Sequence, residues 1–235
     1  MSQLNVTTLK HESAGVDNIT LDANGRVGIG TSSPATPLDV TKANGGNFVA
    51  TFQNTSSSTP YGVFIKDAPS GANGYPLLTV TNSAGAHYFR VDSGTGYVTM
   101  PYQPCFSAWH ASAGATSTAG TVLSFDSTLV NVGNHYSTST NRFTAPVAGI
   151  YQFSWTALHR DATVQCVSLY KNGTNIWQQG PLHVTNHNVA EVTLGATVFL
   201  NVAAGDYFDV RVFSISGGSV FYGHGHANFT GRLVG

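Results

Sequence analysis

Short stretches in which apolar and polar residues alternate run along the whole chain, separated by Gly, Asn, Ser and Pro. A period of two is typical of β-strands that bury one face, whereas an amphipathic helix would repeat every 3.6 residues. No stretch of the sequence follows the helical period. The sequence therefore predicts an all-β protein.

The first clear element is a hairpin that begins at Asn18. Ile19 and Leu21 alternate with polar residues, the turn 22–25 follows, and alternation resumes at residues 27–29. The closely spaced glycines 25, 28 and 30 raise the alternative of a phosphate-binding loop. Such a loop opens directly into a helix, and Pro34 and Pro37 exclude one here. We therefore favour the hairpin.

Residues 47–100 repeat the same alternation in short segments. The strands predicted there are residues 48–52, 61–66, 77–81, 88–91 and 97–100. Small hairpins bury too little apolar surface to be stable alone and usually need a neighbouring chain or a second layer. We predict a β-rich shaft domain at residues 44–100, preceded by a cap or fibre connector at residues 1–43.

After Met100 the strands become longer and richer in aromatic residues. The strands predicted in this part are residues 121–125, 142–144, 149–158, 164–171, 174–178, 190–200, 206–214 and 227–233. Many strands joined by Gly, Asn and Pro turns indicate an antiparallel sandwich or barrel, and a jelly roll is a common closed form at this length. Residues 101–235 are predicted to form this head domain.

One strand of the head carries three aromatic residues on the same face. The turn 145–149 leads into residues 150–155, in which Tyr151, Phe153 and Trp155 alternate with polar residues. Three exposed aromatic rings would form a large apolar patch, so we expect them in the core or at a contact between subunits.

The spacing of these residues resembles the signature of the complement C1q globular head family. The positions that carry the resemblance are Phe125, Asn131, Tyr136, Phe143, Gly149, Tyr151 and Phe153. Trp155 stands where that family has Phe or Tyr, and weaker similarities extend the resemblance to residues 101–235. It implies a jelly roll similar to tumour necrosis factor that assembles as a homotrimer. The residues then expected in the trimer core or interface are Tyr136, Phe143, Tyr151, Phe153 and Trp155.

Residues 22–40 resemble a short cap of phage tail fibre proteins. Charged residues make up only 9% of the chain, far below the usual share of about a quarter, which suits an exposed, durable particle. Together with a trimeric head, these features predict a phage tail fibre in the virion, which attaches to a polysaccharide on the bacterial host. The expected partners are other tail or fibre proteins and the host glycan. The alternatives are an architectural virion protein and a fibre-borne polysaccharide hydrolase.

Charge and cysteine content exclude several other classes of function. The formal net charge is −1 and Lys and Arg do not cluster, so nucleic acid is not an expected partner. The start of the chain lacks the pattern of a secretory signal. No window approaches the about 18 apolar residues of a membrane span, so we expect no membrane insertion. Cys105 and Cys166 are predicted to be buried thiols.

Catalytic patterns are absent from the sequence. No pair of carboxylates stands out for glycoside cleavage, and no Gly-x-Ser-x-Gly motif occurs. We therefore predict that the protein is not an enzyme and has no cofactor. His224 and His226 could bind a divalent metal only with a third ligand from His183, His187 or another chain, so no metal is assigned. The residues predicted to bind a ligand, as aromatic faces and neutral polar groups bind sugars, are Trp109, Trp177, Tyr222, His224 and His226.

Overall fold

The structure, a computed structural model, describes residues 7–10, 18–41, 49–50, 52, 63–65, 76–112, 115–116, 118–160, 164–176, 182–185, 191–216, 220–221 and 225–235. The chain divides into two compact units, residues 1–66 and 67–235. Within the described ranges every element is a β-strand apart from the 3-10 helix Val132–Asn134, so the all-β prediction is confirmed. No helix among these residues is long and apolar enough to cross a membrane.

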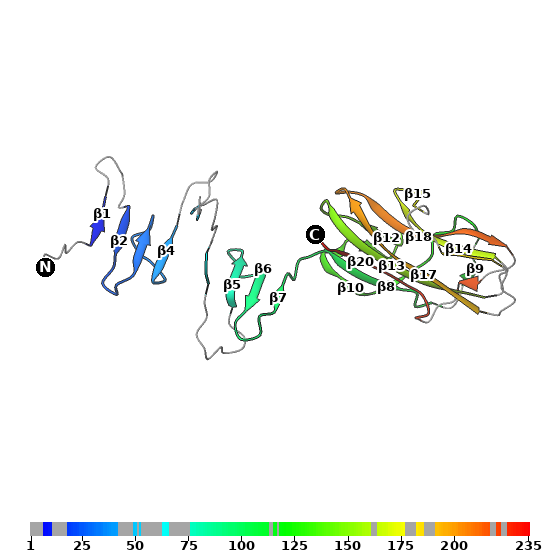
Figure 1. The fold of residues 1–235 in the computed structure, drawn as a ribbon, viewed down its shortest axis with the longest axis horizontal. Helices are drawn as coiled ribbons and strands as arrows, with labels where there is room; N and C mark the ends of the chain where they lie inside the picture. Colours follow the sequence, from blue (N-terminus) through cyan, green and yellow to red (C-terminus); the bar gives the residue numbers. More distant parts are fainter. Residues whose placement is uncertain are drawn as a thin grey trace, which may run out of the picture. The chain divides into compact units, whose positions relative to one another are not determined.

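The first unit contains a four-stranded sheet, which we call the N-terminal sheet (Figure 1). Its strands, in order across the sheet, are β1 (Thr8–Leu9), β2 (Ile19–Leu21), β3 (Val27–Ile29) and β4 (Leu38–Val40). Strands β2 and β3 form the predicted hairpin, closed by a turn in which the Asp22 carboxylate accepts the amides of Asn24 and Arg26. Strand β4 then pairs parallel with β3.

The second unit begins with a three-stranded antiparallel sheet, which we call the middle sheet. It consists of β5 (Pro76–Thr81), β6 (His87–Asp92) and β7 (Val98–Thr99), close to three of the predicted strands. Of the strands predicted at residues 48–52 and 61–66, the described parts 49–50, 52 and 63–65 are not strands. The remainder lies outside the described residues.

The head is built from two facing antiparallel sheets (Figure 1). The first contains β10 (Ser127–Asn131), β8 (Cys105–Trp109), β20 (Asn228–Leu233), β13 (Gly149–Arg160), β17 (Glu191–Val202), β19 (Val220–Phe221) and β9 (Ala115–Thr116). The second contains β11 (Tyr136–Ser137), β12 (Arg142–Thr144), β18 (Tyr207–Ser216), β14 (Val164–Lys171), β15 (Thr174–Asn175) and β16 (Leu182–Thr185). From β12 to β14 and from β17 to β20 the long strands alternate between the two sheets, so the predicted jelly roll is confirmed.

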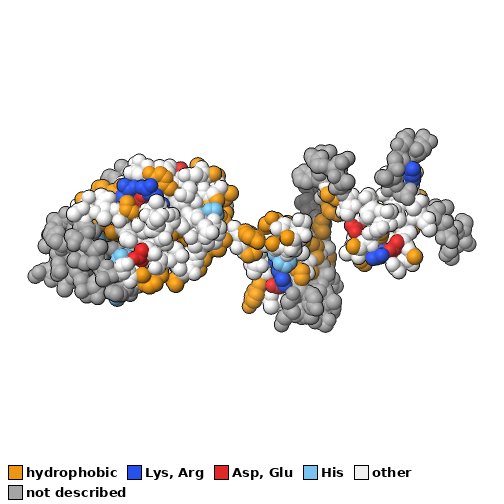
Figure 2. Space-filling model, turned by 180° about the vertical axis from the view of Figure 1, so that it is seen from behind, with side chains coloured by type: hydrophobic (Ala, Val, Ile, Leu, Met, Phe, Trp, Pro, Cys, Tyr) orange, Lys and Arg blue, Asp and Glu red, His pale blue; other side chains and the backbone are white. Residues whose placement is uncertain are grey.

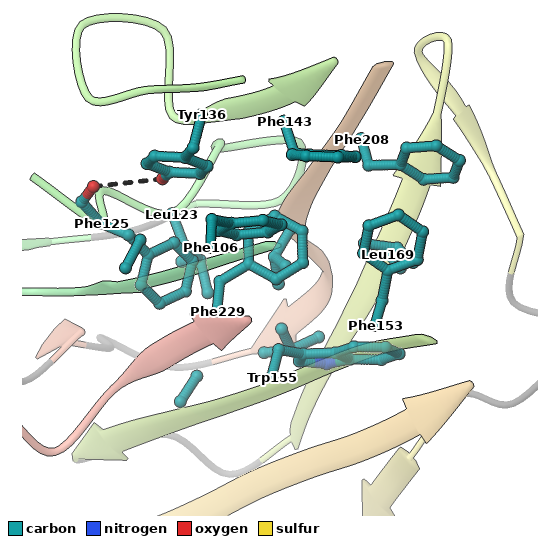
Figure 3. Close-up of a cluster of buried hydrophobic side chains, with 14 of the residues drawn as sticks. Phe106, Leu123, Phe125, Tyr136, Phe143, Phe153, Trp155, Leu169, Phe208 and Phe229 are labelled. Carbon is teal, nitrogen blue, oxygen red and sulfur yellow. Dashed lines mark hydrogen bonds between the residues drawn. The ribbon is translucent and has the colours of Figure 1, made fainter. Parts of the chain in front are cut away.

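Aromatic rings fill the space between the two sheets (Figure 3). Tyr151, Phe153 and Trp155 of β13 all point inward and are fully or almost fully buried, because alternate side chains of a strand share a face. The Phe153 ring lies 4.4 Å from the Phe208 ring of the opposite sheet, measured between centroids. Phe143 stacks on Phe106 at 4.8 Å. The rings therefore join the two sheets into one core.

A glycine on β20 leaves room for two of these rings. A Cβ atom added at Gly231 would lie 2.5 Å from Phe106 Cε1 and 2.7 Å from Phe153 Cδ1, distances too short for any side chain. Gly231 pairs with Phe106 on β8 and with Phe153 on β13. Strand β20 therefore has no side chain at the position where its two neighbouring strands place Phe106 and Phe153.

Asn131 and Tyr136 show why the aromatic signature contains an asparagine. The Asn131 side chain donates to the Tyr136 carbonyl at 2.9 Å and accepts the Tyr136 amide at 3.1 Å. The Tyr136 hydroxyl then donates to the Phe125 carbonyl at 3.1 Å (Figure 3). These bonds satisfy polar groups next to the core, where an unpaired group would cost about 1–3 kcal/mol.

One predicted strand of the head is not a strand. In the segment 121–125, Val122 makes only an isolated bridge with Arg211, although Leu123 and Phe125 are buried in the core. The Phe125 amide donates to the Asn141 side chain instead of to a neighbouring strand. Apolar alternation here reflects burial in the core: the segment lies beside β18 of the second sheet, and the next strand along the chain, β10, belongs to the first sheet.

His159 of β13 gives the head a specific sensitivity to acid. It is fully buried, and burial lowers its pKa from 6.5 to about 4. As the pH falls from about 6.5 to about 4, the unfolded chain takes up a proton that the folded head does not, so stability is lost across this window. The difference corresponds to about 3 kcal/mol at most. We expect denaturant unfolding to show this loss between pH 7 and pH 4.

The matched variants are His159→Gln and His226→Gln, since His226 is exposed. His159→Gln should flatten the pH dependence, whereas His226→Gln should retain it. Equal slopes in the wild-type protein and in His159→Gln would show that another group causes the acid sensitivity.

Candidate functional site

The outer face of the first head sheet is a broad surface that spans five neighbouring strands. It is formed by the side chains of β8, β10, β20, β13 and β17 that point away from the core. We call it the assembly face, and its residues are Cys105, Ser107, Trp109, Leu129, Val130, Ile150, Gln152, Ser154, Thr156, Thr197, Phe199, Asn228, Thr230 and Arg232. They alternate in sequence with the buried core residues.

Hydroxyl groups form a row across the middle of the assembly face. Ser107, Thr230, Ser154 and Thr197 lie opposite one another on four neighbouring strands. The Thr197 hydroxyl donates to Ser154 Oγ at 3.0 Å. Because these side chains are short and partly satisfy one another, another protein surface can approach the sheet closely here without burying a charge.

Exposed apolar side chains lie at both edges of the assembly face. Phe199 on β17 is 59% exposed, and Leu129 and Val130 on β10 are 75% and 45% exposed. A hollow of about 420 Å³ lies between these edges, and its lining includes Cys105, Ser107, Val130, Gln152, Thr230 and Arg232. A hollowed face with exposed apolar side chains at its edges is typical of a surface that another protein covers.

Arg232 is the only charged residue of the assembly face as defined above. Its Nε atom donates to Gln152 Oε1 at 2.9 Å, and it lies opposite Cys105 on β8. Depletion of charge is characteristic of the centre of protein interfaces.

The outer face of the second head sheet carries a different cluster, in which one carboxylate pairs with two arginines. Asp209 is fully buried and accepts Arg142 Nε at 3.0 Å and Arg211 Nε at 2.5 Å. The Arg142 guanidinium lies 4.5 Å above the Tyr207 ring, and the Arg211 guanidinium 4.6 Å above the Tyr170 ring. The hydrogen bond to Asp209 raises the pKa of Arg211. This arrangement links β12, β18 and β14.

Ser112, Asp126 and His110 also lie close together in the head, but the serine hydroxyl donates to the aspartate and not to the histidine. Ser112 Oγ donates to Asp126 Oδ2 at 2.5 Å, and His110 Nδ1 lies 3.8 Å from the same carboxylate. Burial alone would raise the pKa of Asp126, but hydrogen bonds from Ser112 and the Ala111 amide outweigh it and the pKa is lowered. A nucleophilic serine needs an imidazole as its direct base, so this group is structural.

The predicted site residues occupy different parts of the head. Tyr136, Phe143, Tyr151, Phe153 and Trp155 all lie in the core of the single chain, and their contact with other copies stays a prediction. Trp109 is half-buried on the assembly face, and His226 is exposed in the loop before β20. Trp177, Tyr222 and His224 lie outside the described residues.

The structure bears on the predictions about metal binding and about the two cysteines. Among the described residues, no three His, Cys, Asp or Glu side chains gather in a group that could hold a metal ion. Cys166 is buried and burial raises the pKa of its thiol, whereas Cys105 is only partly buried on the assembly face. The prediction of a buried thiol is therefore confirmed for Cys166 alone.

Sequence reasoning missed both the hydroxyl row and the Asp209 cluster. The alternation of Gln152, Ser154 and Thr156 with aromatic residues was the available signal for the hydroxyl row. The sequence contains no such signal for the Asp209 cluster, because Arg142 lies 67 positions from Asp209 along the chain.

Comparison with known proteins places the head among C1q domains. A model of the C1q domain family matches residues 105–234. Complement C1q tumor necrosis factor-related protein 5 of Rattus norvegicus is 30% identical over 133 residues, which cover 53% of this chain and 54% of that protein. Complement C1q and tumor necrosis factor-related protein 9B of Homo sapiens is 33% identical over 93 residues, which cover 37% of this chain and 28% of that protein.

Solved structures show a more distant likeness. The globular domain of zebrafish complement 1qA protein is 18% identical, with a TM-score of 0.43 over 57% of this chain and 98% of that chain. Murine APRIL is 11% identical, with a TM-score of 0.43 over 56% of this chain and 99% of that chain. The chain spans about half or less of the length of the curated relatives named above.

These relatives overturn the predicted biological setting. They are vertebrate proteins named for complement C1q and tumor necrosis factor, so the prediction of a phage tail fibre is wrong, and so is the predicted localisation in a virion. The fibre partners and the bacterial glycan were deduced from that interpretation and lose their basis with it. The resemblance of residues 22–40 to a fibre cap does not identify the protein.

Proposed function

The chain belongs to the C1q domain family, whose model matches more than half of it, and we propose on that premise that it is a non-enzymatic, homotrimeric recognition protein that acts outside the cell. The assembly face is the observation that carries the proposal. Within this proposal the chain keeps the division into residues 1–43, 44–100 and 101–235, of which the last forms the trimeric head.

The composition of the assembly face supports self-association. Its centre is a row of small hydroxyl side chains, its edges are apolar, and it contains one charge, on Arg232. A closed symmetric assembly places the same surface of every copy near its axis, and such a surface must avoid like charges close together. The hydroxyl row at the centre of the assembly face contains no charged residue and therefore meets this requirement.

A trimer also allows the head to recognise a partner through a shallow surface. The hollow on the assembly face would be covered by the neighbouring copies, which leaves the loops and the second sheet to face solvent. Three copies of one weak contact give a much higher overall affinity than one copy, provided that all three can engage together. We propose this repeated, shallow contact as the mode of recognition.

The surroundings of Ser112 and His159 fit the non-enzymatic part of the proposal. In the described part of the head, Ser112 donates to a carboxylate and not to an imidazole. The buried His159 has its pKa lowered to about 4, below the range in which a general base works at neutral pH.

Substitution of Ser154 by arginine tests the trimer. Ser154 lies in the middle of the hydroxyl row between Thr230 and Thr197, so Ser154→Arg places a long charged side chain at the centre of the contact in every copy. We expect sedimentation at micromolar concentration to show a trimer for the wild-type protein and a monomer for Ser154→Arg, with the same circular dichroism.

The matched control is Ser139→Arg, because Ser139 is exposed in the turn between β11 and β12 and lies off the assembly face. It should remain a trimer. A wild-type monomer would contradict the proposal, and so would a folded Ser154→Arg protein that stays trimeric.

A further inference from the structure

The N-terminal sheet has one face on which every side chain is apolar. Register places Leu9, Ile19, Ile29 and Val40 in one row across the four strands, and Leu21, Val27 and Leu38 in the next. Four of these side chains are strongly exposed: Leu9 by 48%, Leu21 and Ile29 by 40%, and Leu38 by 61%. We call this surface the N-terminal apolar face.

The opposite side of the same sheet is polar and closely packed. It carries Thr8, Thr20, Gly28 and Asp39 in register. A Cβ atom added at Gly28 would lie 2.4 Å from the Thr31 carbonyl oxygen, so the chain itself covers this side near Gly28. The sheet is therefore two-sided, and its exposed apolar side chains all lie on one face.

The middle sheet repeats this arrangement. Leu78, Val91 and Val98 lie opposite one another, and Val80 lies opposite Phe89. Val80 and Val98 are 52% and 56% exposed, and the polar side of the sheet carries Thr79, Arg90 and Thr99. We call the apolar side the middle apolar face. Figure 2 shows hydrophobic side chains at the surface of this part of the chain.

Sheets of this size need a second layer to be stable. A few short strands become independently stable only when a hydrophobic face is buried against another element. Contiguous exposed apolar surface is rare in soluble proteins unless it is an interaction site. Both faces therefore require an occupant, and neither carries a charged residue that would select a charged partner.

The chain itself supplies a fitting occupant. The five residues 100–104 join β7 to β8 of the head, and five residues span at most about 18 Å. If the head is a trimer, three copies of the middle sheet are held at a local concentration on the order of millimolar. Identical apolar faces are complementary to one another without any charge pairing.

We propose that the N-terminal and middle apolar faces are each covered by the same face of two other copies of this chain. The inference rests on the proposed trimer of the head and extends the subunit contact to the residues before it. These two sheets then fold fully only in the assembled protein, because each copy completes the hydrophobic layer of the others.

Hydrogen exchange of the full chain, followed by mass spectrometry, tests this inference. Ser154→Arg is the decisive variant, because it separates the heads and leaves the sequence of both upstream sheets unchanged. We expect the amides of β2, β3, β5 and β6 to exchange at least tenfold faster in Ser154→Arg than in the wild-type trimer. Amides of β13 in the head core should keep most of their protection.

A second pair of variants acts on the apolar face directly. Ile29→Asp places a charge on the N-terminal apolar face, whereas Thr8→Asp places the same charge on the polar side of the same sheet. Both proteins should sediment as trimers, because the head is unchanged. Exchange at β2 and β3 should rise at least tenfold in Ile29→Asp and stay near the wild-type rate in Thr8→Asp.

Two results would overturn the inference while the trimeric head survives. One is a Ser154→Arg monomer whose upstream sheets keep their wild-type protection, which would mean that the faces are covered within one chain. The other is equal exchange in Ile29→Asp and Thr8→Asp. Sedimentation of the wild-type protein as a monomer would instead refute the proposed trimer, and this inference with it.

Discussion

Replacement of Asp209 by alanine should destabilise the head by about 3 kcal/mol, the lower end of the cost of removing one partner from a buried ion pair. Asp209 is fully buried and holds two guanidinium groups. Without it, Arg142 and Arg211 face each other as like charges that remain partly buried. The expected result is a lower midpoint of denaturant unfolding with an unchanged m-value.

A triple variant separates lost charge pairing from lost packing. In Arg142→Met, Asp209→Leu and Arg211→Met combined, apolar side chains replace the whole cluster, and such replacements are often neutral or stabilising. We expect it to recover most of the stability that Asp209→Ala loses. If the triple variant is as unstable as Asp209→Ala, the shape of the cluster matters more than its charge.

Substitution of Phe153 by alanine should destabilise the head by about 3–5 kcal/mol. Phe153 is completely buried, and its ring contacts those of Phe208 and Phe143 on the opposite sheet. Removal of the ring leaves a cavity between the two sheets that its rigid neighbours cannot fill. Denaturant unfolding followed by circular dichroism measures this loss.

Phe213→Ala is the matched control for this substitution. Phe213 lies on β18 and is 43% exposed, so its removal should change the free energy of unfolding by less than about 1 kcal/mol. A similar loss in both variants would mean that Phe153 does not anchor the two sheets.

The fold could be predicted from sequence because its strongest signal is local. Tyr151, Phe153 and Trp155 alternate within one strand, and a period of two has a single physical meaning wherever one side is buried. The segment 121–125 has similar alternation but no strand pairing beyond one bridge. Burial of Leu123 and Phe125 needs only that they point inward, so hydrophobicity alone could not separate a strand from a packed loop.

The assembly face and the Asp209 cluster were much harder to predict. Serine and threonine occur throughout this chain, so their presence at Ser154 and Thr230 carries no signal until the register aligns the strands. Arg142 and Asp209 meet only because β12 pairs with β18. A contact set by the pairing of distant strands has no trace in the local sequence.

The error in biological setting has a different origin. Residues 22–40 complete a hairpin with Ile19–Leu21 and add one parallel strand, an arrangement that chains of unrelated function can use. A low content of charged residues likewise describes a type of protein surface and does not identify the organism from which the protein comes. Neither feature is tied to a binding site, and fold elements alone do not identify function.

Gly231 shows how the packing of the head constrains one position on a strand. Because the Phe106 and Phe153 rings both occupy the space beside its Cα atom, even a methyl group at position 231 would displace two rings at once. A smaller residue at one ring position relieves only one of the two contacts and opens a cavity in the core. The choice of residue on β20 is therefore set by the side chains of both neighbouring strands.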